Sequence, residues 1–419
     1  MFIKFTIAVL TATLLSSSAL AQTEVSVLRV EIADEVQKGY YADLATAYEK
    51  ANPDVKINLK YIANEAYKTK LPTLLQSDAR PDVFYSWSGL TLVEQAEAGF
   101  LRDISGVVSE ETLGTIPEGT VEAYRVNGEL VGLPLYAAEV VFWVNTALTE
   151  KAGVDHTSIK TWGDFLAAVK TLKDAGITPI IAGGQDKWPL HFYWSFLALR
   201  EGGADTLPMA TGGEGEGFLA EPFVKAGEKF QQLVELEPFQ PGFMSTNFET
   251  ATSLFSNDKA AFHLMGEWAY SAIQDQASKG APLADENLGV FSFPIVEGGA
   301  DNEGRVTLGG INGWAVTKDA PDEAVAYMEF MLEQENQRKA AELGIYIPIT
   351  GGAEDGISNP YFKKIAEDLS NSEYHQIFLD QFLGASVGAT VNDVSADLAA
   401  KVISPEEAAK QVQEAWDFR

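Results

Sequence analysis

The feature that most constrains the fold is a regular alternation of strand-like and helix-like segments near the N-terminus. Residues 24–32, 54–62 and 81–87 are short runs rich in β-branched and aromatic residues, which is typical of strands. Residues 34–52 and 66–79 lie between them and carry apolar residues at helical spacing. Because strands separated by helices usually pair in parallel, this order predicts βαβ units in an open α/β sheet.

The same alternation restarts later in the chain. We predict further strands at 140–148, 177–184, 259–268 and 287–299, and further helices at 161–176, 321–344 and 404–416. Thr161 and Ser404 stand at the N-cap positions of two of these helices. No repeat or long linker separates the halves of this 419-residue chain. We therefore expect two α/β lobes connected by several strands.

Polar and aromatic residues suited to binding follow several of the predicted strands. Ligands of open α/β sheets bind at the carboxyl ends of the strands. A sugar ring needs aromatic planes for its apolar face and polar side chains for its hydroxyl rim. The candidates that meet these conditions are Asp34, Glu35, Ser86, Trp87, Tyr136, Glu139, Asp186, Trp188, Glu267, Trp268, Gly310 and Asn312.

The aromatic stretch 183–197 is predicted to serve both the binding site and the core. Asp186, Trp188 and His191 belong to the part expected to face the cleft, and Pro189 suits the first turn of a helix. The following residues have the spacing of a buried helix face, so the division is expected just after His191. Four other tryptophans are expected to pack inward, and they are Trp143, Trp162, Trp194 and Trp314.

Several kinds of chemistry are excluded or disfavoured. The chain has no cysteine, which excludes disulfides and thiolate metal sites. The stretch 384–388 matches the G-x-S-x-G motif of serine hydrolases, but helical spacing precedes Ser386 and no histidine follows it. The histidines show no metal-ligand spacing, so neither a metal nor a cofactor is expected. A glycosidase, which needs two carboxylates across a cleft, stays open among 60 acidic residues.

Residues 1–21 have the pattern of a secretory signal peptide. Lys4 precedes a short apolar stretch that ends at Ala19-Leu20-Ala21, so cleavage is expected after Ala21. No cysteine is present for lipid attachment, and no second apolar span follows, so the mature protein is expected to be exported and not membrane-inserted. The formal net charge of −30 disfavours nucleic acid and other anionic partners and favours a neutral ligand.

The order of several motifs resembles a known family. These motifs are "ARPDVFYSWSG", "VGLPLYAAEVVFWVNTALTEKAGV", "KAAFHLMGEW", "LGGINGWAVTKDAPDEAVAYMEFML" and "GIYIPI". Together they are similar to the family 1 extracellular solute-binding proteins, the maltose-binding-protein-like receptors of bacterial ABC sugar importers. The resemblance extends over essentially the whole mature chain.

The resemblance implies two lobes that close on one sugar in the cleft between them. Lobe 1 would comprise residues 22–135 and 288–343, and lobe 2 residues 136–287 and 344–419. It also implies that Ser86 and Trp87 line the sugar site and that Trp268 stacks on a ring. Gly310 and Asn312 would present backbone and a polar group, and Asp34 or Glu35 a further contact. Trp188 corresponds to a more variable platform region.

The implied function is that of a monomeric, non-enzymatic periplasmic receptor that delivers its sugar to a membrane permease. Several aromatic platforms favour a di- to tetrasaccharide, and we lean toward α-galactosides of the raffinose and melibiose type. The lack of a basic cluster near the predicted site disfavours uronic sugars, although a single arginine elsewhere in the fold could overturn this. The alternatives are a secreted carbohydrate-active enzyme and a receptor for a polyol, glycoside or sugar derivative.

Overall fold

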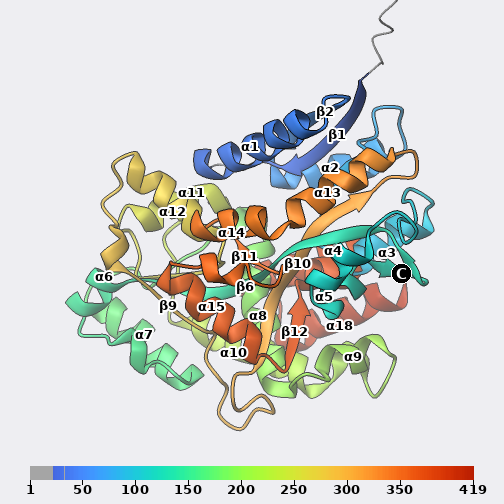
Figure 1. The fold of residues 1–419 in the computed structure, drawn as a ribbon. Coiled ribbons are helices and arrows are strands. Elements are labelled where there is room, and N and C mark those ends of the chain that lie inside the picture. The colour runs from blue at the N-terminus through green and yellow to red at the C-terminus, as the bar shows by residue number, and fades with distance from the viewer. Residues whose placement is uncertain (1–21, 33) are drawn as a thin grey trace, which may run out of the picture.

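The computed structural model describes residues 22–32 and 34–419, and the predicted signal peptide lies outside them. The predicted α/β fold with two lobes is confirmed (Figure 1). A mixed sheet runs through the molecule with the strand order β2-β1-β3-β10-β6-β8-β7. Its strands are β1 (Thr23–Val30), β2 (Val55–Ile62), β3 (Val83–Ser86), β6 (Gly132–Asn145), β7 (Ile180–Ile181), β8 (Phe262–Gly266) and β10 (Val306–Val316).

The predicted βαβ start of the chain is confirmed. β1 pairs in parallel with β2 and β3, and the connecting helices are α1 (Glu35–Ala51) and α2 (Asn64–Leu75). Asp34 caps α1 by accepting hydrogen bonds from the backbone N–H groups of Val36 and Gln37. Further elements of this part are α3 (Gly89–Glu97), α4 (Glu110–Thr115), α5 (Glu118–Glu122), β4 (Arg125–Val126) and β5 (Glu129–Leu130).

One long strand joins the two lobes. The first half of β6, up to Glu139, pairs with β10, and the second half, from Val140, pairs with β8. The short strand β11 (Ile347–Pro348) adds to the first half, and β9 (Leu288–Phe291) adds to the second half. The prediction set the lobe boundary at residue 288 and so placed β9 in lobe 1. In the structure β9 pairs with the second half of β6, as β8 does. The segment between β9 and β10 is therefore where the chain returns to the first sheet half.

Helices surround the second half of the sheet. Thr161 forms the predicted capping box with Asp164 at the start of α7, and Ser404 caps α18. α8 is buried along nearly its whole length, and the predicted core positions of Trp143, Trp162 and Trp194 are confirmed. The helices are α6 (Thr146–Lys151), α7 (Trp162–Asp174), α8 (Trp188–Gly202), α9 (Thr206–Thr211), α10 (Glu221–Glu235), α11 (Phe248–Ser256), α12 (Ala269–Ser278), α15 (Pro360–Asn371), α16 (Leu379–Phe382), α17 (Gly384–Ala399) and α18 (Pro405–Asp417).

Several sequence-based element predictions were wrong in part: the strands expected at 177–184 and 287–299 are shorter, and two other segments also differ. The expected helix at 321–344 is two helices, α13 (Asp322–Leu332) and α14 (Gln334–Glu342), because Glu333 has an extended ψ angle of 139°. The helical spacing expected at 374–383 is instead strand β12 (Tyr374–Ile377) followed by α16. β12 pairs with the start of β10, so tertiary pairing overrode the local pattern.

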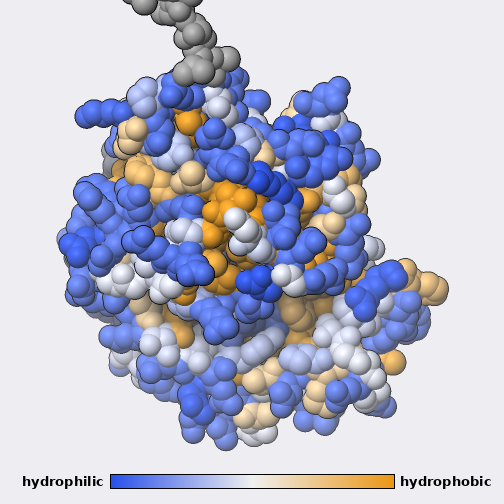
Figure 2. All heavy atoms as spheres, turned by 45° about the vertical axis from the view of Figure 1, so that its right-hand side comes forward, coloured by the Kyte–Doolittle hydropathy of each residue, from blue (hydrophilic) through white to orange (hydrophobic). Residues whose placement is uncertain are grey.

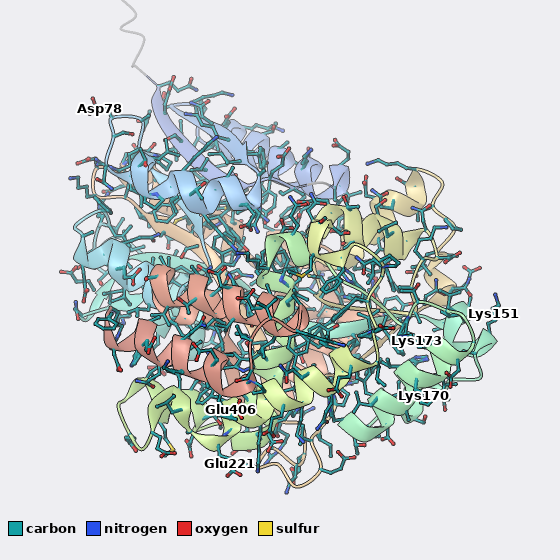
Figure 3. The ribbon with its side chains drawn as sticks, turned by 180° about the vertical axis from the view of Figure 1, so that it is seen from behind. Asp78, Lys151, Lys170, Lys173, Glu221 and Glu406 are labelled. Atoms are coloured by element: carbon teal, nitrogen blue, oxygen red, sulfur yellow. The ribbon has the colours of Figure 1, made fainter. Side chains whose placement is uncertain are left out.

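Charged side chains cover the outside of the molecule. Lys170 and Lys173 on α7 point outward and form ion pairs with Asp174 and Glu237 (Figure 3). Hydrophilic residues make up most of the face in Figure 2, and hydrophobic atoms gather in a hollow near its centre. Over the described part of the chain, we find no helix with the length and apolar character needed to span a membrane.

Candidate ligand-binding site

A cavity of about 620 Å³ lies where segments of both lobes and the connecting strands meet. Lobe 1 contributes the end of β1, the starts of α1 and α2, and the end of β3. Lobe 2 contributes the starts of α8, α11 and α12 together with α16, and β6 and β10 contribute one residue each. The predicted residues that line the cavity are Asp34, Trp87, Tyr136, Asp186, Trp188, His191, Trp268 and Asn312.

Three tryptophans line the cavity, one from lobe 1 and two from lobe 2. The ring of Trp87 meets Tyr67 and Tyr85 edge-on, which fixes its orientation at the end of β3. The ring of Trp268 lies over Gly266, where a Cβ atom would come within 1.9 Å of it. A glycine is therefore required at the end of β8 for Trp268 to take this position.

Trp188 begins α8 and faces the cavity. The turn before it is tight, because Lys187 has a positive φ angle of 63°. The Trp188 ring contacts Phe192 and Phe248, and only 8% of the residue is exposed. Its indole Nε1–H has no hydrogen-bond partner among the described residues. A buried indole N–H usually finds a partner, but this donor is left unsatisfied by the described part of the chain.

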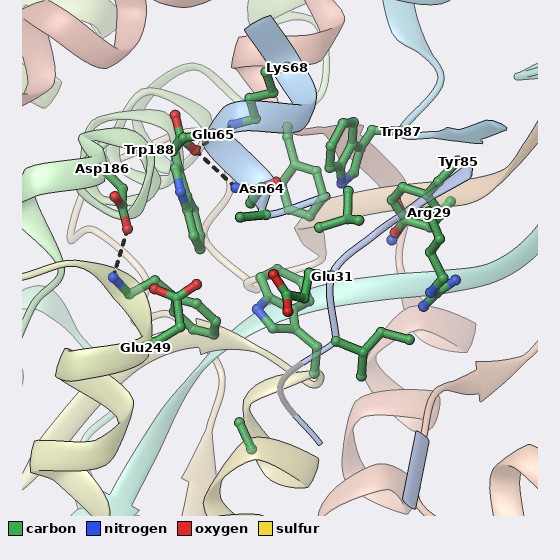
Figure 4. A pocket seen from close by; sticks show the side chains of 18 of the residues that line it. Arg29, Glu31, Asn64, Glu65, Lys68, Tyr85, Trp87, Asp186, Trp188 and Glu249 are labelled. Carbon is green, nitrogen blue, oxygen red and sulfur yellow. Dashed lines mark hydrogen bonds and ion pairs between the residues drawn. The ribbon is translucent and has the colours of Figure 1, made fainter. Parts of the chain in front are cut away.

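One end of the cavity is acidic. Glu65, Asp186 and Glu249 lie around Trp188 and come from both lobes (Figure 4). Asp186 accepts a hydrogen bond of 2.7 Å from the backbone N–H of Phe248. Burial raises the pKa values of Glu65 and Asp186 above their ordinary range, and neighbouring carboxylates add to the effect. Carboxylates accept but cannot donate when ionised, so this end suits groups that donate hydrogen bonds, such as hydroxyls.

A lysine bridges the two lobes above the cavity. Lys68 on α2 lies 3.3 Å from a carboxylate oxygen of Asp380 on α16. Its Nζ also lies 5.8 Å from the ring centres of both Trp87 and Trp188. Although burial alone would raise the pKa of Asp380, Lys68 and the nearby His191 ring, whose Nε2 lies 3.6 Å from a carboxylate oxygen, hold it well below its usual range. This ion pair connects the lobes directly.

The other end of the cavity is formed by Arg29 and tyrosines (Figure 4). Arg29 lies near the end of β1 beside Tyr85, whose hydroxyl is 2.6 Å from that of Tyr136. Tyr136 in turn stacks on Tyr346 with ring centres 4.8 Å apart. The cavity therefore changes from carboxylates at one end to a guanidinium and phenols at the other.

Five of the predicted site residues do not line the cavity. Ser86 is buried and accepts a hydrogen bond from the backbone N–H of Ser88, while Glu35 is exposed on the first turn of α1. Glu139 and Glu267 are buried where β6 crosses between the lobes. Gly310 lies behind the wall, where a Cβ atom would come within 2.5 Å of Asn312.

Two predicted residues in the cavity wall also have structural partners. The carboxylate of Asp34 is engaged as the N-cap of α1, although burial raises its pKa. The Asn312 side chain is buried, and its Oδ1 is without a hydrogen-bond partner in the described ranges. Asn312 is therefore the more available of the two to a ligand.

The sequence analysis missed more than two thirds of the cavity wall. The main residues missed are Arg29, Glu31, Asn64, Glu65, Lys68, Tyr85, Asn247, Glu249, Ser271, Phe378 and Asp380. Most lie on the first turns of helices, where a polar residue looks like any solvated position. Arg29 did carry a signal, because it continues the alternation of Val25 and Val27, which face the interior.

Two α/β lobes with a ligand-sized cavity between them are typical of two-lobe solute-binding proteins. The chain belongs to the bacterial extracellular solute-binding protein family, whose profile matches residues 33–338. The expected family membership is thereby confirmed. A relative from Pyrococcus horikoshii, described as an uncharacterized ABC transporter extracellular-binding protein, is 25% identical over 344 residues. That match covers 80% of this chain and 74% of the relative.

Two solved structures of similar fold come from work that concerns carbohydrates. One, from work on xylan utilization by Caldanaerobius polysaccharolyticus, has a TM-score of 0.86 and 26% identity and covers 93% of this chain and 99% of that one. Another is a chitin oligosaccharide binding protein with a TM-score of 0.83 and 22% identity, covering 95% of this chain and 98% of the other. At 22% identity the second likeness shows the fold alone.

Proposed function

We propose that this protein is the sugar-binding receptor of a bacterial ABC importer and that its ligand is an oligosaccharide of two to four rings. The observation that carries the proposal is the placement of Trp87, Trp188 and Trp268 around one cavity. Each additional sugar ring needs a flat apolar surface of its own, and three such surfaces exceed the need of a monosaccharide. The similarity to a structure from work on xylan utilization supports the same ligand class.

The mechanism follows from the two-lobe arrangement. Trp87 lies on lobe 1, whereas Trp188 and Trp268 lie on lobe 2, so a sugar touches all three only when the lobes are close together. A ligand stabilises the closed form in proportion to its extra contacts in that form. Hydroxyls of the sugar donate to Glu65, Asp186 and Glu249, and the indole N–H of Trp188 donates to a sugar oxygen.

The closed receptor then delivers its cargo unchanged. No bond is made or broken by this chain, and the permease partner recognises the outer surface formed by both lobes. The mature protein acts as a monomer in the periplasm after the signal peptide has been removed behind Ala21. From the sequence we favour neutral α-galactosides of the raffinose and melibiose type. Within the oligosaccharides this choice stays a prediction.

A thermal-shift screen tests the proposal. Mono-, di-, tri- and tetrasaccharides, including melibiose, raffinose, xylotriose and chitotriose, are added to the purified mature protein. A ligand at 100 times its Kd should raise the unfolding free energy by about 2.7 kcal/mol. We expect at least one oligosaccharide to do so and to be recovered intact. Hydrolysis would instead indicate a glycosidase, and no shift with any sugar or polyol would contradict the proposal.

A further inference from the structure

Arg29 is buried in the cavity wall within a cage of aromatic rings. Its guanidinium carbon lies 4.1 Å from the ring centre of Tyr41, 5.0 Å from Tyr85 and 5.7 Å from Trp314. Only 5% of the residue is exposed. Aromatic faces attract a cation, but they accept no hydrogen bonds of ordinary strength from its N–H groups. The aromatic rings therefore hold the side chain in place but accept no hydrogen bonds from its N–H groups.

The charge of Arg29 has no partner within the described residues. Its Nε and Nη1 atoms are buried there without a hydrogen-bond acceptor. Glu31, just past the end of β1, also lines the cavity but is exposed and forms no ion pair with Arg29 in the described ranges. Buried arginines in folded proteins are normally paired, because an unpaired charge away from water costs several kcal/mol. An acidic partner for Arg29 would have to come from outside the described chain.

The rest of the cavity limits what that partner can be. Glu31, Asp34, Glu65, Asp186 and Glu249 also line it, so a ligand with several negative charges would be repelled. Lys68 is already paired with Asp380 and gives little compensation. An anionic group is therefore favoured only at the Arg29 end, and the remaining rings must be neutral.

We propose that the ring bound at the Arg29 end carries a single carboxylate, so that the ligand is an oligosaccharide with one acidic ring, a uronic or aldonic acid. Arginine has five N–H donors and no acceptor, so it requires an acceptor from the ligand. A hydroxyl could accept a hydrogen bond but would leave the buried charge uncompensated, whereas a carboxylate supplies both acceptor and charge. This inference rests on the proposed function and narrows its ligand class.

The test compares matched pairs of sugars by isothermal titration calorimetry. Each pair joins a neutral trisaccharide with the same sugar carrying one terminal uronic acid, for example glucosyl- and glucuronosyl-xylobiose. We expect wild-type protein to bind the acidic member of at least one pair ten times or more tighter than the neutral member. Trigalacturonate, with a carboxylate on every ring, should bind more weakly than a trisaccharide with one.

Two variants show whether Arg29 is the cause. Arg29→Met should bring the Kd values of the acidic and neutral members within about twofold of each other, and Arg29→Lys should keep part of the preference. Equal or tighter binding of every neutral member to the wild type would overturn the inference and leave the oligosaccharide receptor standing. If no sugar in either set binds, the proposed function fails and this inference fails with it.

Discussion

Among the described residues two arginines are buried, and their surroundings differ: one has an acidic partner and the other has none. Arg200 on α8 forms an ion pair with Asp301 and donates hydrogen bonds to the backbone carbonyls of Phe293, Pro294 and Val306. Arg29 has an aromatic cage and no acidic partner among the described residues. The difference shows that this chain can surround a buried guanidinium with an acidic partner and hydrogen-bond acceptors, as it does for Arg200. A buried guanidinium without a hydrogen-bond acceptor beside a cavity is best explained by a ligand that supplies the acceptor.

Removing Arg200 should give the largest effect on stability. Arg200→Met leaves the carboxylate of Asp301 buried beside three carbonyls that have lost their donor. Breaking a buried ion pair from one side costs about 3–5 kcal/mol, and we expect the upper end here. Urea unfolding followed by circular dichroism measures it, with the outward-facing Lys170→Met as control. A loss below about 1 kcal/mol would mean that Arg200 is no more essential to the fold than Arg29.

Glu267 shows a third way to bury an ionisable group, because it can be buried uncharged. Burial raises its pKa to about 8, and the backbone N–H of Glu139 donates to it over 3.1 Å. Between the unfolded pKa and about 8 the folded state holds a proton that the unfolded state has lost. Stability should therefore fall as pH rises from about 4.5 to 8, by on the order of 5 kcal/mol.

Glu267→Gln should remove this fall, because an amide stays neutral at every pH. Unfolding free energies measured at pH 5, 7 and 9 would show a flatter profile than that of the wild type, with the largest gain at pH 9. The exposed Glu129→Gln is the matched control and should leave the profile unchanged. A Glu267→Gln profile as steep as that of the wild type would contradict a neutral buried carboxyl.

Trp268 should matter to the ligand more than to the fold. Trp268→Ala removes a stacking surface, so we expect oligosaccharide affinity to fall more than tenfold, or about 1.4 kcal/mol. Tryptophan fluorescence titration with the best sugar from the thermal-shift screen measures this. Trp194→Ala is the control, because this fully buried side chain belongs to the core and its loss should cost about 3–5 kcal/mol of stability instead. Unchanged sugar affinity would show that Trp268, like Trp194, serves the core and not the ligand.

Trp188 should show a smaller effect that depends on ligand length. It lies at the acidic end, away from Arg29, so it meets a ring that a disaccharide need not have (Figure 4). Trp188→Phe should weaken trisaccharides severalfold and disaccharides little, as judged by Kd from the same titration. Equal losses for both lengths would show that Trp188 contacts a ring common to all ligands.

Much of the fold could be predicted from local patterns. The β1-α1-β2-α2-β3 order, the caps at Thr161 and Ser404 and the inward-facing Trp143 and Trp194 all follow from periodicity and capping chemistry within a few residues. β12 could not be predicted in this way, because its extended shape depends on pairing with β10, some seventy residues earlier.

The cavity wall was harder to predict than the fold. Tryptophans at strand ends stand out in a sequence, and Trp87, Trp188 and Trp268 do line the cavity. Glu65 and Glu249 look like ordinary first-turn residues, and only the approach of the two lobes brings them together. Glu139 and Glu267 were predicted because, like the tryptophans, they stand near strand ends. Their side chains are buried where β6 crosses between the lobes, and the carboxylate of Glu267 accepts a hydrogen bond from the backbone there.

The central claim is that Arg200 serves the fold and Arg29 serves the ligand. The most direct test is the unfolding free energy of Arg29→Met, measured with and without the sugar that stabilises the wild type most. Replacing an unpaired buried charge by an apolar side chain of similar length should leave the ligand-free value unchanged or raise it. The stabilisation by an acidic trisaccharide should fall to that given by its neutral counterpart. A ligand-free loss of 3 kcal/mol or more, with the sugar effect intact, would contradict the claim.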